Sequence, residues 1–187
     1  SSQSDSAFAS DLEEAQGYLE DDKLDAASGK LDSLEQDSSL TDEQRKQVED
    51  MKNKLQSAKD SAQQQQENEQ KKSERKQAFS SEMDELESDD LKISSAANAE
   101  DELAMTASSF EQWDELLSEM YDYLAGVLNA DQYASEEENY KQWVAERDSG
   151  AENAASATED STQKQLASYS FKQSYTKARC YKLLDMM

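Results

Sequence analysis

The chain contains no proline and only four glycines in 187 residues. These residues most often interrupt helices and mark tight turns, so their scarcity leaves long segments free to remain helical. Charged residues make up 33% of the sequence, as expected for helices with broad solvent-exposed faces. An all-α fold is therefore the natural prediction.

Apolar residues near the start of the chain recur in steps of three and four, the spacing that places side chains on one face of a helix. Such steps cover residues 8–19, 24–34 and 48–62. No segment shows a sustained alternation of apolar and polar residues, which a strand would require. Residues 7–62 are predicted to form an N-terminal three-helix unit, in which a helical hairpin precedes a third helix.

A polar segment, residues 63–77, follows this unit and contains no apolar side chain. It has nothing to hold it against a core, but most of its residues are good helix formers. We interpret it as an exposed helical spacer, and a flexible low-complexity linker is the alternative. Thr41 and Gln44 have the spacing of a capping box and mark the start of the helix that would continue into the spacer.

Residues 78–187 carry the strongest amphipathic pattern in the chain. Apolar residues step by three and four through residues 110–127, and two later helices show similar stripes, in which Gln173 is a polar exception. Trp113 and Trp143 lie on these stripes, which favours burial in a core over an exposed platform for binding. The pattern predicts a C-terminal antiparallel helix bundle with short connections.

The net charge narrows the class of partner. The sequence has 43 acidic and 19 basic residues, a formal net charge of −24. A nucleic-acid partner is excluded, because binding it requires cationic groups that displace counterions. An acidic field instead attracts cationic partners. No apolar run approaches the roughly 18 residues needed to span a bilayer.

The first residues, 1–6, are small and polar and suit a tether. They fit a mature exported protein cut just after a lipidated cysteine, or equally a trimmed domain. The single cysteine, Cys180, cannot form an internal disulfide, so it offers no redox evidence for export.

The residue types of several active sites are missing. The chain has no histidine, which removes His-based triads and His zinc sites, and it leaves Cys180 without an activating base. The glycines are isolated, so no phosphate loop is present, and the acidic clusters lack the spacing of a calcium loop. Paired carboxylates for glycosidase chemistry remain conceivable, but nothing singles out a pair. We therefore expect no catalytic residue, no metal, no cofactor and no enzymatic activity.

Three phrases occur in order in the last part of the chain: SSFEQWDELLSEMYDYL at 108–124, YKQWVAERD at 140–148 and SYTKARCYKLL at 174–184. Their order and wording resemble the LprI-like family, small helical domains of the bacterial envelope named after a lysozyme inhibitor. The resemblance covers roughly residues 79–187. The matching positions are Trp113, Asp114, Leu117, Tyr121, Trp143, Arg147, Asp148, Thr176 and Arg179.

Two arginines of this set lie beside the predicted core. Arg147 falls on the Trp143 side of its helix, and Arg179 lies next to the stripe of the last helix. Because an unpaired buried charge is expensive, we expect one of them to pair with an acid from another helix, with Asp114 or Asp148 preferred. A structural clasp of this kind is favoured over a ligand site.

The resemblance implies a non-catalytic binding protein of the cell envelope. It would be extracellular and lipid-anchored to the membrane of a Gram-positive bacterium, through an anchor absent from this chain. Its partner would be a protein, with a cationic lysozyme as the candidate, steered by opposite charge. The alternative is a structural or sensing module of the cell surface, with the N-terminal unit binding a partner and the spacer setting a distance.

The contacts to such a partner are expected from an exposed loop. The most exposed candidate is the segment 149–162, which is rich in small and polar residues. The candidate contact residues in it are Ser149, Glu152, Asn153, Glu159 and Asp160.

Overall fold

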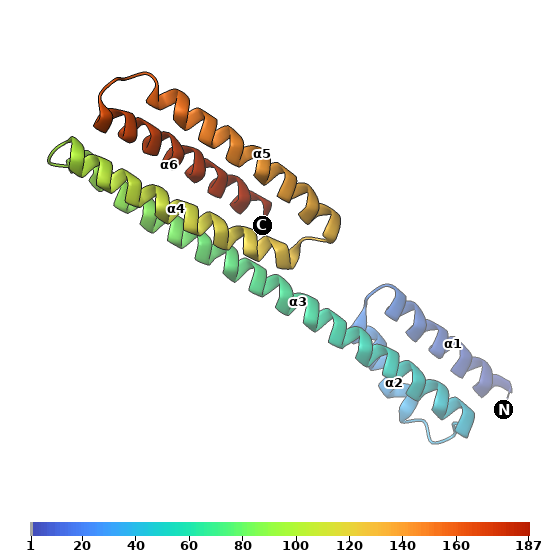
Figure 1. The fold of residues 1–187 in the computed structure, drawn as a ribbon. Coiled ribbons are helices and arrows are strands. Elements are labelled where there is room, and N and C mark those ends of the chain that lie inside the picture. The colour runs from blue at the N-terminus through green and yellow to red at the C-terminus, as the bar shows by residue number, and fades with distance from the viewer. Residues whose placement is uncertain (1) are drawn as a thin grey trace. The chain divides into compact units, whose positions relative to one another are not determined.

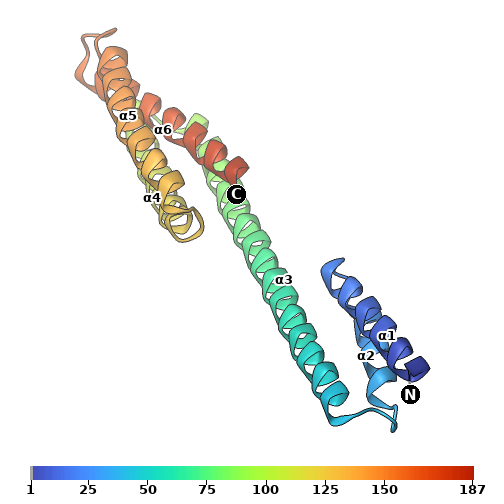
Figure 2. The same ribbon diagram turned by 90° about the vertical axis from the view of Figure 1, so that its right-hand side faces the viewer.

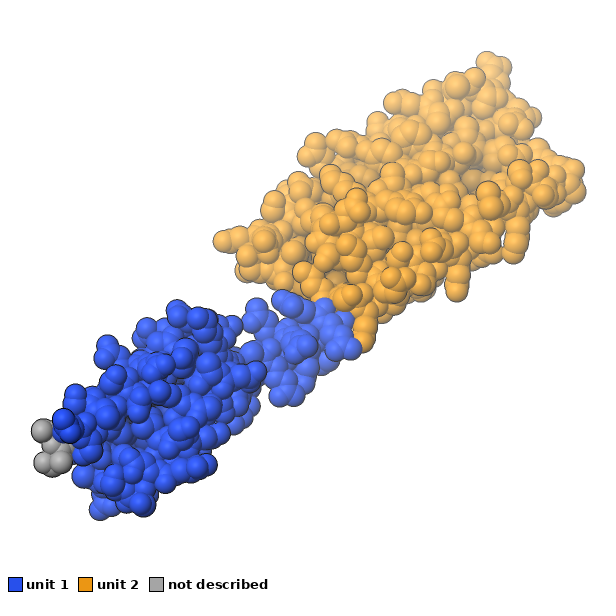
Figure 3. Space-filling view, turned by 180° about the vertical axis from the view of Figure 1, so that it is seen from behind, with its two compact units in different colours: residues 1–71 blue, residues 72–187 orange. Residues whose placement is uncertain are grey.

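The computed structural model describes residues 2–187, and within that range all regular elements are helices (Figure 1), which confirms the predicted all-α fold. The elements are α1 (Ser2–Glu20), α2 (Leu24–Glu35), α3 (Asp42–Asp90), the 3₁₀ helix η1 (Leu91–Ser95), α4 (Ala99–Val127), α5 (Ala130–Ala155) and α6 (Ser161–Met186). No helix in the described range is long and apolar enough to cross a bilayer. The chain divides into two compact units at Lys71 and Lys72, within α3 (Figure 3).

Unit 1 consists of α1, α2 and the first part of α3. α1 and α2 pack against each other as a hairpin, as the sequence pattern predicts. The apolar stripes of the three helices form one buried core. The buried residues of this core are Phe8, Ala15, Ala27, Leu31, Leu34, Leu40, Val48 and Leu55.

The predicted capping box at the start of α3 is confirmed. The backbone N–H of Thr41 donates to Oε1 of Gln44 at 2.9 Å, and the backbone N–H of Gln44 donates to Oγ1 of Thr41 at 3.1 Å. Nε2 of Gln44 also donates to Oδ1 of Asp5 at 3.2 Å, in the first turn of α1. Residues 2–6, expected to be a tether, belong to α1 instead, because this bond and the favourable place of an acidic side chain at a helix start hold the turn. Residue 1 of that expected tether lies outside the described residues.

The spacer is helical, as predicted, and the flexible-linker alternative is wrong. Residues 63–77 lie within α3, and every one of their side chains is exposed. Bonds between residues four apart run along this helix: Gln63 donates to Glu67 at 3.2 Å, and Gln64 donates to Asn68 at 3.0 Å. Helix propensity and such side-chain pairs therefore stabilise a stretch that packs against no core.

Unit 2 is a bundle made of the last part of α3, η1, α4, α5 and α6. Successive long helices run in opposite directions, and α6 packs closely against both α4 and α5 (Figures 1 and 2). The predicted antiparallel bundle is therefore confirmed. The buried residues of its core are Phe79, Met83, Trp113, Leu116, Leu117, Met120, Leu124, Trp143, Cys180 and Leu183.

Side-chain caps explain the short connections of unit 2. Asn98 caps α4 by accepting from the backbone N–H of Asp101 at 2.8 Å. Asn129 and Gln132 form a reciprocal capping box at the start of α5. Asp160 caps α6 by accepting from the backbone of residue 163 at 2.9 Å. Because each cap satisfies otherwise unpaired N–H groups, a helix can restart within a few residues and fold back along its predecessor.

Candidate binding surface

Arg147 is the side chain at which three helices of the bundle are joined. Its Nη1 donates to Oδ1 of Asp114 at 2.9 Å and to Oγ1 of Thr176 at 3.4 Å, and its Nε donates to Oδ1 of Asp148 at 3.3 Å. The guanidinium also lies 5.0 Å from the centre of a Trp143 ring. The expected ion pair between an arginine and an acid of another helix is confirmed by Asp114, which lies on α4.

Arg179 forms a second clasp, with a partner that the sequence did not indicate. Its Nε donates to Oη of Tyr121 at 2.9 Å, and its Nη2 donates to Oε2 of Glu136 at 3.3 Å. Glu136 replaces the preferred Asp114 or Asp148 because α5 and α6 are antiparallel, so a residue later in α6 faces an earlier part of α5. Burial raises the pKa of Tyr121, although Arg179 opposes this effect, so the phenol remains protonated at neutral pH.

The two tryptophans are core residues, as predicted. Trp113 and Leu117 are fully enclosed within the bundle. Trp143 stacks with Tyr140, at 5.8 Å between ring centres, and with Tyr175, at 5.6 Å. With the Arg147 guanidinium also over its ring, Trp143 is only 8% exposed and offers little surface to a ligand.

Asp90, at the end of α3, is a largely buried anchor that the sequence pattern did not indicate. Its carboxylate accepts from Trp113 Nε1 at 2.9 Å, from Gln173 Nε2 at 3.1 Å, from Lys177 Nζ at 2.7 Å and from Ser109 Oγ. In the sequence, Asp90 cannot be distinguished from the other acidic residues near the end of α3. The signal that could have revealed it is the polar Gln173 on an apolar stripe, together with an indole N–H that needs an acceptor.

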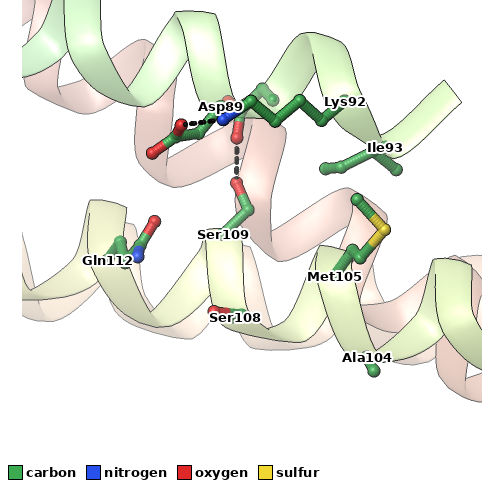
Figure 4. Close-up of a pocket in the computed structure, with 9 residues that line it drawn as sticks. Asp89, Lys92, Ile93, Ala104, Met105, Ser108, Ser109 and Gln112 are labelled. Carbon is green, nitrogen blue, oxygen red and sulfur yellow. Dashed lines mark hydrogen bonds and ion pairs between the residues drawn. The ribbon is translucent and has the colours of Figure 1, made fainter. Parts of the chain in front are cut away.

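A hollow of about 420 Å³ lies beside this anchor, between η1 and α4. In Figure 4, Ser109 is directed toward the carboxylate at the end of α3, and Met105 faces Ile93. Lys92 on its rim pairs with Asp89 at 3.1 Å. Because Lys92 and Asp89 pair with each other and Asp90 pairs with Lys177, this hollow offers little to an incoming ligand.

A different groove, of about 230 Å³, lies between α3 and α4 and is strongly acidic. We call it the acidic groove, and its carboxylates are those of Glu82, Glu85, Glu115 and Glu119. None of the four makes an ion pair within the described part of the chain, residues 2–187. Burial and the charge of Glu119 raise the pKa of Glu82, and the charge of Arg75 offsets this only in part. The groove therefore holds negative charge that the protein itself does not neutralise.

The segment proposed as a contact loop is mostly helix. α5 continues through Ala155 and α6 begins at Ser161, so only residues 156–160 connect them. The first half of the segment contains several alanines, which favour helix, and packs against α6: Ala151 is buried, and a Cβ atom on Gly150 would lie 2.2 Å from the ring of Phe171. All five candidate residues are exposed. Ser149, Glu152 and Asn153 lie on α5, Asp160 caps α6, and Glu159 lies in the connection.

Cys180 is enclosed in the core, where its Sγ lies 3.6 Å from the backbone oxygen of Trp113. Burial is the main cause that raises the pKa of its thiol to about 12, so no thiolate forms near neutral pH. No group of His, Cys, Asp or Glu side chains among residues 2–187 is arranged to hold a metal ion.

Searches against protein-family models, curated proteins and solved structures found no match for this chain.

Proposed function

We propose that the protein is a non-catalytic binding protein of the bacterial cell envelope, of the LprI-like type, and that its partner is a cationic protein. The observation that carries the proposal is the acidic groove, where four glutamates share one hollow without an ion pair in the described chain. Basic side chains of a partner would supply the missing countercharge. The net charge of −24 adds a long-range attraction for the same class of partner.

A lysozyme is the partner that the family resemblance suggests. The matched residues of the three sequence phrases meet in one bundle, around Arg147 and Arg179, which supports reading them as parts of a single domain. Many lysozymes are strongly cationic, so an acidic domain would be steered toward them and could cover their substrate cleft. An extracellular, lipid-anchored location on a Gram-positive cell belongs to the same proposal.

Binding would occur in two stages. Opposite net charges first accelerate the encounter, over distances limited by a Debye length of about 8 Å at 0.15 M salt. A lysine or arginine of the partner then enters the acidic groove, beside the apolar side chains of Leu86 and Leu116. Each exposed ion pair contributes at most about 1 kcal/mol, so several pairs and some apolar contact are needed for a stable complex.

The direct test is inhibition of a cationic lysozyme by the purified protein, measured as the loss of lytic activity on bacterial cell walls. The double variant Glu115→Gln/Glu119→Gln removes two charges from the acidic groove. We expect it to weaken inhibition about tenfold, the loss of roughly 1.4 kcal/mol.

A matched control removes two charges elsewhere on unit 2. Asp122→Asn/Glu137→Gln changes exposed side chains outside the groove and should weaken inhibition by less than about threefold. Equal effects of the two variants would mean that net charge alone, and not the groove, attracts the enzyme. If the protein inhibits no lysozyme, the structural or sensing module becomes the better proposal, and the separate core of unit 1 favours it.

A further inference from the structure

A cleft of about 400 Å³ between α5 and α6 is built differently from the acidic groove. Gln142 and Glu146 of α5 line one side, and Tyr175, Arg179 and Lys182 of α6 line the other. It is therefore a place where two cationic side chains gather in a strongly acidic protein. Its volume lies in the range of sites for small molecules.

Arg179 has an unused donor at this cleft. Its Nε and Nη2 are bonded to Tyr121 and Glu136, whereas its Nη1 has no acceptor within the described protein. Every fully buried polar side-chain atom in the described residues has a partner. Nη1 is therefore not fully buried, and Arg179 lines the cleft, although the residue is only 8% exposed. A largely buried guanidinium thus presents one free N–H₂ group to a ligand.

Lys182 is also without a partner. From residue 99 onward the chain has seven lysines and arginines, and within this fully described range the other six contact a carboxylate, a backbone oxygen or an aromatic ring. Lys182 makes no such contact, although acids outnumber bases more than twofold in the sequence. It follows Arg179 by three residues on the same helix, so the two side chains lie on one face.

We propose that this cleft binds a small carboxylate-bearing molecule, whose carboxylate is shared by Nη1 of Arg179 and Nζ of Lys182. Charge-assisted bonds from a guanidinium and an ammonium are the usual means of holding a carboxylate. The side-chain amides of Asn139 and Gln142 already donate to Glu136 at 3.3 Å and to Glu146 at 3.2 Å, which leaves their carbonyl oxygens to accept from other polar groups of the ligand.

The surroundings favour a single negative charge on the ligand. Glu136 already neutralises part of the Arg179 charge, and Glu146, which accepts from Tyr175 at 3.1 Å, lies in the cleft wall. A phosphate dianion would be repelled by these two acids more strongly than a carboxylate monoanion. A monocarboxylate with a neighbouring hydroxyl or ammonium group fits best, because that group can donate to Glu146.

Trp143 and Trp113 together provide an internal probe. Trp143 lines the cleft, whereas Trp113 is enclosed in the core away from it, so their indole N–H signals in a ¹H–¹⁵N spectrum report different places. The full chain is titrated separately with lactate, alanine and inorganic phosphate. We expect lactate or alanine to shift the Trp143 signal saturably, with little shift at Trp113 and weaker binding of phosphate.

The variant Lys182→Gln removes the ligand contact at an exposed position and keeps the fold. Its expected effect is at least a fivefold loss of affinity. Lys141→Gln is the matched control, since Lys141 is an exposed lysine of α5 that pairs with Glu138 outside the cleft lining, and it should change affinity by less than twofold. Absence of a saturable shift at about 100 mM ligand, equal losses in the two variants, or tighter binding of phosphate would each overturn the proposal. Because the acidic groove is not involved, these outcomes are independent of lysozyme binding.

Discussion

At the scale of single residues, Arg147 shows how one side chain can set the register of a bundle. It bonds to acids on α4 and α5 and to a threonine on α6. Its two carboxylate partners, Asp114 and Asp148, remain about half exposed, so water can solvate them if the arginine is lost. The cost of losing Arg147 therefore comes chiefly from its hydrogen bonds and from the contact of its guanidinium with the Trp143 ring.

We expect Arg147→Ala to lower the free energy of unfolding by about 2 kcal/mol, more than the roughly 1 kcal/mol of an exposed pair. Lys141→Ala, which breaks the exposed pair with Glu138, should change it by less than about 0.5 kcal/mol. Urea unfolding followed by circular dichroism gives both values. Equal stabilities of the two variants would contradict the role of Arg147 as a clasp.

The second prediction at this scale concerns Cys180. Because burial raises the pKa of its thiol to about 12, the folded protein favours the protonated form. The stabilising effect is complete below the ordinary thiol pKa of 9.0 and is lost as the pH rises from there through 12. A disulfide reagent such as Ellman's reagent should label native Cys180 at pH 8 only slowly and label it rapidly in urea. Rapid, complete labelling of the native protein would show that the thiol is not enclosed.

At the scale of helices, the contact between α5 and α6 depends on one glycine. A Cβ atom on Gly150 would overlap the ring of Phe171, whereas one on Gly126, near the end of α4, would meet no atom within 4 Å. The two glycines therefore form a matched pair for testing helix packing against helix propensity.

Gly150→Ala should destabilise the protein by about 1–3 kcal/mol, because the Phe171 ring has to move. Gly126→Ala should instead stabilise it by about 0.5–1 kcal/mol, because alanine has the higher helix propensity. Thermal or urea unfolding of the two variants gives the change in the free energy of unfolding that each substitution causes. A stabilising Gly150→Ala would mean that the helices are not packed as closely as described.

Helix existence could be predicted from the sequence, but some helix ends and contacts could not. Stripes such as 110–127 predict burial because one side of a helix has to face a core. The segment 149–162 looked like a loop because its residues are small and polar, and the packing of its first half against α6, with Gly150 next to Phe171, joins residues far apart in the sequence. Asp90 was missed for the same reason, because its donors come from α4 and α6.

The proposed binding sites likewise have one property that the sequence predicts and others that depend on the fold. The net charge of −24 predicts a cationic partner, and this charge follows from the composition of the sequence alone. The acidic groove, however, needs α3 and α4 side by side, since Glu82 and Glu119 are far apart in the chain. The cleft with Arg179 and Lys182 likewise depends on which guanidinium nitrogens remain unbonded, which no sequence pattern reports.

At the scale of the whole molecule, partner binding should depend on pH through Glu82. Its pKa is raised by burial and by neighbouring acids, so the carboxylate takes up a proton at a higher pH than an ordinary glutamate. Protonation removes a charge from the acidic groove, and affinity for a cationic partner should fall as the pH drops through that raised pKa. The fall should be smaller in Glu82→Gln. Dissociation constants of the wild-type protein and the variant, measured at several pH values, test this. Identical pH profiles in the two proteins would exclude Glu82 as the titrating group.

The most direct test of a cationic partner is calorimetric titration of the intact protein with a cationic lysozyme at about 0.15 M salt. At this ionic strength the Debye length is about 8 Å, so unspecific attraction between distant charges is largely screened. The acidic groove predicts saturable binding with 1:1 stoichiometry, weakened about tenfold by Glu115→Gln/Glu119→Gln. Heats that never saturate, or a stoichiometry that varies with salt, would contradict the proposed function.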